Sequence, residues 1–179
     1  MAETILREFP PNPNLLNYHT RRQLTAMMSE RYTPQSSSYP EKWIQSLCNV
    51  EGITNVHLLR HQIRLRKTEQ INWDQLIKAV ENRLRFHWNE IAISTLEERT
   101  EPRRQFALPD EIFFQRRKVI EGVDQSKNTS MAAELYKIPG ITTLIFHQKT
   151  LIVKRGLNFS WKELSPQIFG VLKNYTPGD

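Results

Sequence analysis

The sequence predicts an α+β protein made of two tandem copies of a small two-layer unit, each an antiparallel sheet with two helices on one face. Residues 50–56 (VEGITNV) recur as residues 138–144 (IPGITTL), 88 positions later. The apolar positions that follow keep this spacing, and alternating and helical patterns succeed each other in both copies. A period this long indicates a duplicated small domain and not a solenoid. We therefore divide the chain into residues 1–89 and residues 90–179.

Composition places the chain among globular proteins with a positive net charge. With 39% hydrophobic and 25% charged residues, the sequence can build a core, whereas disordered chains are poorer in apolar residues. Its 179 residues carry a formal net charge of +6. This charge permits an acidic partner, such as nucleic acid, an anionic membrane surface or an acidic protein, and selects none of them.

The single cysteine and the N-terminus bear on the cellular compartment. Cys48 stands alone, so an internal disulfide is excluded, and a lone thiol fits a reducing compartment. The first residues are polar and acidic and lack the apolar core of a signal peptide. No run approaches the roughly 18 apolar residues that a spanning helix needs. We expect a cytoplasmic protein without a membrane partner.

In the first copy, a short apolar strand over residues 5–9 ends at a stiff loop, residues 10–14 (PPNPN). Prolines fix φ and remove backbone donors, and asparagines favour side-chain turns. Residues 15–24 are expected to return as a second strand. Residues 43–48 then place apolar side chains along one side of a short helix.

A hairpin and a capped helix complete the first copy. In the second arm of the hairpin, Ile63 and Leu65 alternate with arginines, which indicates a half-buried strand with a basic outer face. Asn72 and Gln75 have the spacing of a capping box. They predict the start of a helix whose apolar stripe reaches Trp88.

The second copy is expected to repeat this order. Ile91 and Ile93 alternate with small polar residues and are expected to open its first strand. Pro109 is matched with Pro13, an offset of 96 residues. Because later positions match at 88, the second copy is expected to have lost about eight residues, in the part that matches the serine-rich loop of the first. A helix, a hairpin and a second capped helix, beginning after Ser160, complete it.

Three stretches of the first copy resemble the N-terminal domain of the Nfu/NifU scaffold proteins. Residues 11–15 (PNPNL) are similar to the proline–asparagine signature of that domain. Residues 47–56 (LCNVEGITNV) resemble its glycine turn before the hairpin, and residues 71–76 (INWDQL) resemble its tryptophan-capped last helix. The resemblance spans nearly all of the first copy.

The second copy departs from the family pattern at the signature. It keeps the turn at Gly140 and the helix start at Trp161, whereas residues 107–110 (ALPD) retain one proline and exchange asparagine for aspartate. The resemblance thus implies tandem Nfu N-terminal domains, of which the second has diverged.

The resemblance also implies a role in iron–sulfur cluster assembly or delivery. In the family the cluster sits on a Cys-x-x-Cys motif in a separate C-terminal domain, and this sequence lacks that motif. Cluster ligation needs several thiolates, which one cysteine cannot supply. We therefore expect a non-enzymatic accessory or protein-interaction module. Its expected partners are iron–sulfur assembly or client proteins, and it needs no cofactor of its own.

Candidate binding residues come from the stiff loop and from basic positions of the same copy. A stiffened loop that presents asparagine amides would lose little entropy on binding, although the same residues can serve only to shape the hairpin. The candidates are Pro11, Asn12, Pro13, Asn14, Arg21, Arg22, Arg64 and Arg66.

Other chemistries have less support. His57 and His61 flank the hairpin turn without a neighbouring cysteine or carboxylate, so we interpret them as surface histidines and expect no metal site. Cys48 is interpreted as core packing. The sequence holds no nucleophile–base motif and no glycine-rich phosphate loop, so no catalytic residue is expected. The alternative function is a basic nucleic-acid-binding module, which would need exposed aromatic residues such as Phe113 or Phe114 on a sheet.

Overall fold

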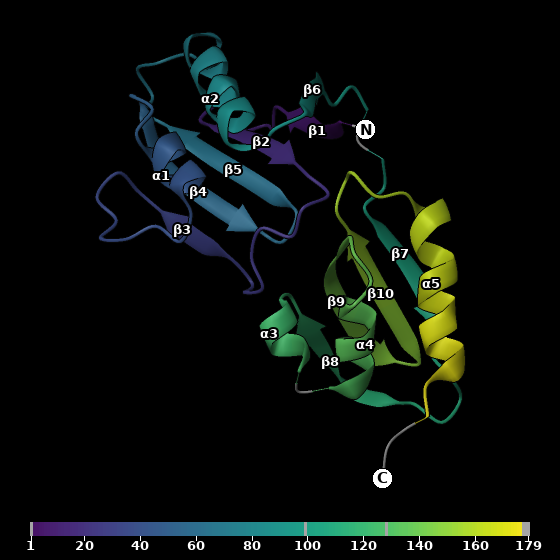
Figure 1. Cartoon of the computed structure of the whole chain (residues 1–179). Coiled ribbons are helices and arrows are strands. Elements are labelled where there is room, and N and C mark those ends of the chain that lie inside the picture. Colours follow the sequence, from purple (N-terminus) through teal and green to yellow (C-terminus); the bar gives the residue numbers. More distant parts are fainter. Residues whose placement is uncertain (1, 99, 128, 177–179) are drawn as a thin grey trace.

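The computed structural model describes residues 2–98, 100–127 and 129–176. Two α+β units follow each other along the chain, and each packs its helices on one face of its own sheet (Figure 1). The fold class predicted from the sequence is therefore confirmed.

The first unit holds a six-stranded sheet in the order β3-β4-β5-β2-β1-β6. All of its neighbouring strands are antiparallel except β1 and β6, which are parallel. Its elements are β1 (Glu3–Glu8), β2 (Leu15–His19), β3 (Glu30–Tyr32), α1 (Lys42–Cys48), β4 (Ile53–Leu59), β5 (Gln62–Lys67), α2 (Trp73–His87) and β6 (Ile91–Thr95).

The second unit holds a four-stranded antiparallel sheet in the order β7-β10-β9-β8. The short helix α3 was not expected from the sequence. The elements of this unit are β7 (Arg103–Ala107), β8 (Phe114–Ile120), α3 (Val123–Ser126), α4 (Ser130–Tyr136), β9 (Ile141–Gln148), β10 (Thr150–Arg155) and α5 (Trp161–Asn174).

The two units repeat each other at one constant spacing of 88 residues. Helix α1 begins at residue 42 and α4 at residue 130; α2 begins at residue 73 and α5 at residue 161. Strand pairing keeps the same spacing, since Tyr18 lies opposite Ile63 and Phe106 lies opposite Leu151. The expected match of Pro13 with Pro109 is therefore wrong. The second copy has lost no residues, and the serine-rich loop of the first copy is matched by the segment that carries α3.

Strand β6 has the sequence position of a first strand of the second unit but lies in the sheet of the first. It pairs in parallel with β1, and Ile5 lies opposite Ile93, again 88 residues apart. The expected strand at Ile91 and Ile93 exists, but the prediction that it opens the second sheet is wrong. Strand β7 consequently forms an edge of the second sheet, whereas β2, its counterpart, is covered by β1. The boundary between residues 89 and 90 stays a prediction.

Alternation along the strands divides each sheet into a core face and a helix-free face. In β4 and β5 the side chains of Val56, Leu58, Ile63 and Leu65 are buried in the core with α1 and α2. The residues between them, such as Arg64, therefore project from the opposite face. That helix-free face of the first sheet is turned toward the second unit.

Candidate functional site, a cleft between the two units

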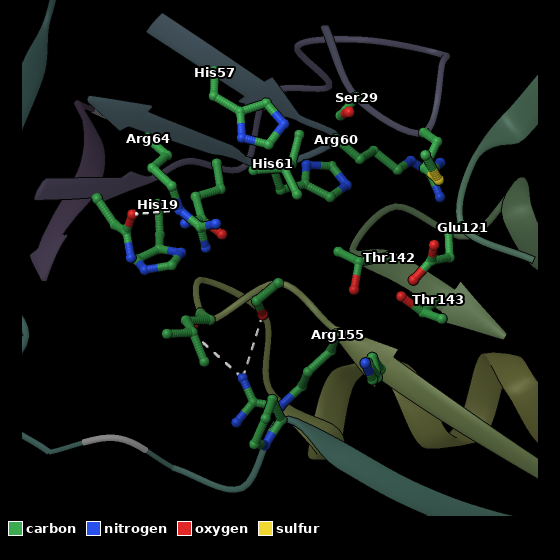
Figure 2. A pocket seen from close by; sticks show the side chains of 18 of the residues that line it. His19, Ser29, His57, Arg60, His61, Arg64, Glu121, Thr142, Thr143 and Arg155 are labelled. Carbon is green, nitrogen blue, oxygen red and sulfur yellow. Dashed lines mark hydrogen bonds between the residues drawn. The ribbon is translucent and has the colours of Figure 1, made fainter. Parts of the chain in front are cut away.

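A cavity of about 440 Å³ separates the helix-free face of the first sheet from the second unit (Figure 2). We call it the interunit cleft. Both units contribute to its walls, and polar side chains predominate in them. The lining side chains used below are Glu8, Asn17, His19, His57, Gln62 and Arg64 from the first unit and Arg103, Glu121, Thr143, Lys154 and Arg155 from the second.

The turn between β4 and β5 closes one end of the cleft by inserting into the second unit. Arg60 donates from Nη1 to the carbonyl of Ile141 at 2.6 Å and from Nη2 to the carbonyl of Tyr136 at 2.7 Å. Its guanidinium also lies 5.0 Å from the centre of the Tyr136 ring. Arg60 is only 6% exposed, so a charged side chain of one unit is buried in the other and joins the two.

His61 forms a second link from the same turn. Its Nε2 accepts the N–H of Gly140 at 3.1 Å, so Nδ1 carries the proton and donates to the carbonyl of Arg22 at 2.9 Å. Burial, together with the neighbouring positive charges of Arg60 and Arg21, lowers the pKa of His61 to about 4, although its backbone hydrogen bonds oppose this shift. The ring is therefore neutral near pH 7. The interpretation of His61 as a surface histidine is wrong, because it is 3% exposed.

The loop before α5 supplies further contacts between the units. Asn158 donates from its amide to the carbonyl of Thr4 at 2.9 Å and to that of His19 at 2.7 Å. Arg21 forms an ion pair with Glu163 and donates to the carbonyl of Asn158 at 2.8 Å. The hydrogen bond from Arg21 lowers the pKa of Glu163, which is therefore a carboxylate near pH 7.

A hydrogen-bonded chain of side chains runs across the floor of the cleft on the first sheet. Arg64 donates from Nε to the amide oxygen of Asn17 at 3.2 Å, and Asn17 donates to Glu8 at 2.8 Å. The same Glu8 oxygen lies 2.7 Å from Nε2 of His19. Since neighbouring strands bring these four residues together, the floor combines a fixed carboxylate with the guanidinium-bearing side chain of Arg64, which lines the cleft (Figure 2).

Three residues that line the cleft each contain a buried nitrogen without a hydrogen-bond partner within the described part of the chain. These nitrogens are Nε2 of His57, Nε2 of Gln62 and Nε of Arg155. Burial lowers the pKa of His57, and the positive charges of Arg31 and Arg64 lower it further. Buried polar groups are nearly always hydrogen-bonded in proteins, so three such atoms around one cavity mark it as a candidate binding site.

The proline loop, residues 10–14, is fixed to the first unit at several points. Asn12 accepts the N–H of Asn14 on its side-chain oxygen at 2.9 Å, which is a side-chain turn. Lys67 donates to the side-chain oxygen of Asn14, and Trp73 donates from Nε1 to the carbonyl of Pro13, both at 3.0 Å. The backbone is thus held, while the side chains of Pro11, Asn12 and Pro13 are exposed.

The structure separates the eight predicted binding residues into two groups. The proline loop precedes β2, and Leu15 at the start of β2 lies opposite Arg66, so the loop, Arg66 and Arg64 occupy neighbouring positions on one part of the sheet. Arg21 and Arg22 follow the other end of β2. Arg22 forms an ion pair with Glu3 at 2.6 Å and lies 4.7 Å from the Trp88 ring centre, so both arginines already have acidic partners.

Reasoning from the sequence missed the residues that join the units. Arg60, Asn158 and Glu163 were not selected, and Arg155 had no signal beyond its charge. The available signal was the Arg60–His61 pair at a hairpin turn, where the second copy has Gln148–Lys149 at the matching positions. A turn that differs between two copies of one fold indicates a local role that only one copy performs.

Cys48 lies in the core of the first unit and is 1% exposed, as predicted. Burial raises the pKa of its thiol to about 11, against a smaller lowering by a hydrogen bond with Tyr39. Within residues 2–98, 100–127 and 129–176, no cluster of three or more histidine, cysteine or acidic side chains is placed to hold a metal ion. Over the same residues, no helix is long and apolar enough to cross a membrane.

Comparison with known families gives a match over most of the chain. The family described as scaffold protein Nfu/NifU N terminal matches residues 5–90 and again residues 97–178. The chain belongs to this family. The recognition of tandem Nfu N-terminal domains from the sequence is thereby confirmed, and each matched segment covers most of one unit of the fold, with β6 outside both.

Solved structures similar to this Nfu N-terminal protein come from staphylococci. The crystal structure of protein SAV1430 from Staphylococcus aureus has 24% sequence identity and a TM-score of 0.41, and the match covers 47% of this chain and 99% of that one. The solution structure of the same protein gives 25% identity, a TM-score of 0.38, and coverage of 46% and 89%. A Staphylococcus epidermidis protein gives 21%, 0.36, 45% and 93%. Comparison with curated protein sequences gives no match.

Proposed function

We propose that this tandem Nfu N-terminal protein is a non-enzymatic accessory module that docks proteins of iron–sulfur cluster assembly or delivery in the cytoplasm, without ligating the cluster itself. The observation that carries the proposal is the family match over both units. The partners are assembly proteins or the client proteins that receive clusters.

The position of Cys48 supports a role beside the cluster and not around it. Iron–sulfur clusters are held by several cysteine thiolates that converge on iron. The one cysteine of this chain is enclosed by the core, and its raised pKa keeps it protonated near pH 7. Reaching a cluster would require opening the first unit, so cluster ligation is left to another protein or domain.

We place the docking surface on the proline loop with Arg64 and Arg66. The hydrogen bonds of Asn12, Asn14 and Pro13 hold the loop in one shape before a partner arrives, which reduces the entropy lost on binding. Phe9, next to the loop, is 51% exposed and adds an apolar contact. Arg66 is exposed and supplies positive charge for an acidic partner surface.

Arg21 and Arg22 form a second basic position in this proposal. Their side chains are 48% and 42% exposed, but each is already paired with a glutamate. A partner would have to compete with Glu163 or Glu3 for them. We therefore expect Arg21 and Arg22 to contribute less to docking than the proline loop.

Binding to purified components tests the proposal. The full chain is immobilised and probed with purified cluster-scaffold and apo client proteins of the same organism, and binding is compared with variants Phe9→Ser and Arg66→Glu. The matched control is Arg117→Glu, an exposed arginine on β8 of the second unit. We expect Phe9→Ser and Arg66→Glu each to weaken binding about tenfold and Arg117→Glu to have little effect.

Two results would contradict the proposal. One is the absence of binding to every component tested. The other is preferred binding of single-stranded nucleic acid with an affinity that falls steeply with salt, which is the behaviour of a basic nucleic-acid-binding module.

A further inference from the structure

The charges around the interunit cleft are unbalanced toward the positive. Its walls carry the basic side chains Arg64, Arg103, Lys154 and Arg155 besides Arg60, which is used in joining the units. Two carboxylates, Glu8 and Glu121, line the same cavity. Glu8 is already hydrogen-bonded to Asn17 and His19, so its carboxylate is held in place by the first sheet.

Buried nitrogens without partners belong to residues that line the cleft from both units. Nε2 of His57 and Nε2 of Gln62 come from the first sheet and Nε of Arg155 comes from the second unit, and all three lack a partner within the described part of the chain. Lys154 lies opposite Thr143 in the second sheet, and both line the cavity. A ligand that accepts hydrogen bonds at two ends would pair with Arg64 on the wall of the first unit and with Lys154 on that of the second.

We propose that the interunit cleft binds a small organic anion that carries two or more carboxylate or phosphate groups. The cavity of about 440 Å³ falls within the range of roughly 300–1,000 Å³ found for small-molecule sites. Guanidinium groups suit both kinds of oxyanion because their planar fork can donate two parallel hydrogen bonds. Arg64 holds one end on the first sheet, and Lys154 with Arg103 holds the other on the second unit.

This proposal does not depend on the docking function proposed above. The residues of the proline loop and Arg66 do not line the interunit cleft, so a ligand in the cleft leaves them accessible and occupies only Arg64 of the docking surface. The cleft is closed at one end by the Arg60–His61 turn, which belongs to the first unit but is anchored in the second. An anion that bridges the two sheets would therefore also strengthen the attachment of the units to each other.

Calorimetric titration of the full chain tests the site with two probes, citrate for carboxylates and inorganic pyrophosphate for phosphates, at constant ionic strength. We expect at least one probe to bind, and its identity distinguishes the two chemistries. Arg64→Gln and Lys154→Gln should each weaken that binding about tenfold, since each removes one charge-assisted contact. Arg66→Gln removes the same charge two residues away on β5, outside the cleft, and should change affinity by less than about twofold.

A second readout does not rely on a single variant. The pKa of His57 is lowered by burial and by Arg31 and Arg64, so an anion bound nearby should raise it. Nuclear magnetic resonance titration of the His57 ring, with and without the binding probe, should show an upward shift. The proposal is overturned if neither probe binds, if Arg66→Gln weakens binding as much as Arg64→Gln and Lys154→Gln do, or if the His57 pKa does not move with the probe bound.

Discussion

Trp73 and Trp161, 88 residues apart, each donate an indole hydrogen bond of 3.0 Å to a loop carbonyl of their own unit. Trp73 donates to Pro13 and Trp161 to Glu101. Their acceptors are also 88 residues apart, so Glu101 occupies the place of Pro13. The second unit thus keeps the tryptophan hydrogen bond that holds the proline loop in the first unit. Of the prolines and asparagines of the signature, the matching segment of the second unit contains only one proline, Pro102.

Replacing Trp73 by phenylalanine should destabilise the first unit through this bond. Trp73→Phe leaves the carbonyl of Pro13 without its donor, and we expect a loss of about 1–3 kcal/mol in the free energy of unfolding. Urea denaturation followed by circular dichroism measures it. Trp161→Phe is the matched variant, and its loss should be smaller because the Trp161–Glu101 bond is exposed to water. An equal loss in both variants would contradict this account.

Stability should depend on pH through His61. Its pKa is about 4 in the folded protein and 6.5 when unperturbed, so the unfolded chain binds the proton more readily. The contribution of the neutral ring is fully present above pH 6.5 and is lost as the pH falls toward 4. From the difference between the two pKa values we expect about 3 kcal/mol over this window.

The pH effect is measured as the unfolding free energy of the wild type and of His61→Gln at several pH values. Glutamine does not titrate but can still accept from Gly140 and donate to the carbonyl of Arg22. The variant should lose much of the slope between pH 4 and pH 6.5. A slope equal to that of the wild type would assign the pH dependence to other groups.

Removing the guanidinium of Arg60 should loosen the two units from each other. Arg60→Met keeps the length of the side chain but leaves the carbonyls of Tyr136 and Ile141 without their donor. Two buried carbonyls without partners cost about 2–4 kcal/mol. Thermal unfolding should change from one transition toward two, and small-angle scattering should show a larger radius. Arg31→Met, at an exposed arginine of β3, should leave both measurements unchanged.

The glycine turn that both copies share should tolerate no side chain. Gly140 has φ of 97°, and a Cβ there would lie 2.4 Å from the ring of Phe159; Gly52 has φ of 93°, and its Cβ would meet a flexible end of Ile71 at 2.5 Å. We expect Gly140→Ala to cost more than Gly52→Ala, which itself costs at least about 1 kcal/mol. Gly170→Ala in α5 meets nothing and should stabilise the protein by up to about 1 kcal/mol. Denaturation midpoints decide the order.

Much of the fold could be predicted from local sequence, because strands and helices place their apolar residues at regular intervals. Alternation at Ile63 and Leu65 predicted β5, and the pattern of Asn72 with Gln75 predicted the start of α2, where Gln75 accepts the N–H of Asn72 at 3.3 Å. Short irregular elements such as β3 and α3 carry too few residues for a period to show. Pro109 led to the wrong alignment of the two copies, because the match of one proline with Pro13 was given more weight than the pattern of apolar residues. That pattern places Phe106 opposite Leu151.

The interunit cleft could not be predicted, because it depends on how the two units meet. No local pattern reports that Arg60 reaches the carbonyls of Tyr136 and Ile141, which lie 76 and 81 positions further along the chain. The burial of His61 follows from the same contact. Sequence reasoning could identify Arg64 as a basic position on an outer strand face, but it could not show that this face is enclosed.

The parallel pairing of β1 with β6 has a consequence for how this protein can be dissected or recombined. The opening segment of the second copy, β6, pairs in the sheet of the first copy, so a cut at residue 90 would remove a strand from the larger sheet. The fragment that keeps β6 would have a sheet of its own that does not include this strand. The first half without β6 is therefore not a self-contained module, whereas the second sheet is complete without that strand. The dependence runs in one direction: the first copy needs the opening segment of the second to complete the edge of its sheet.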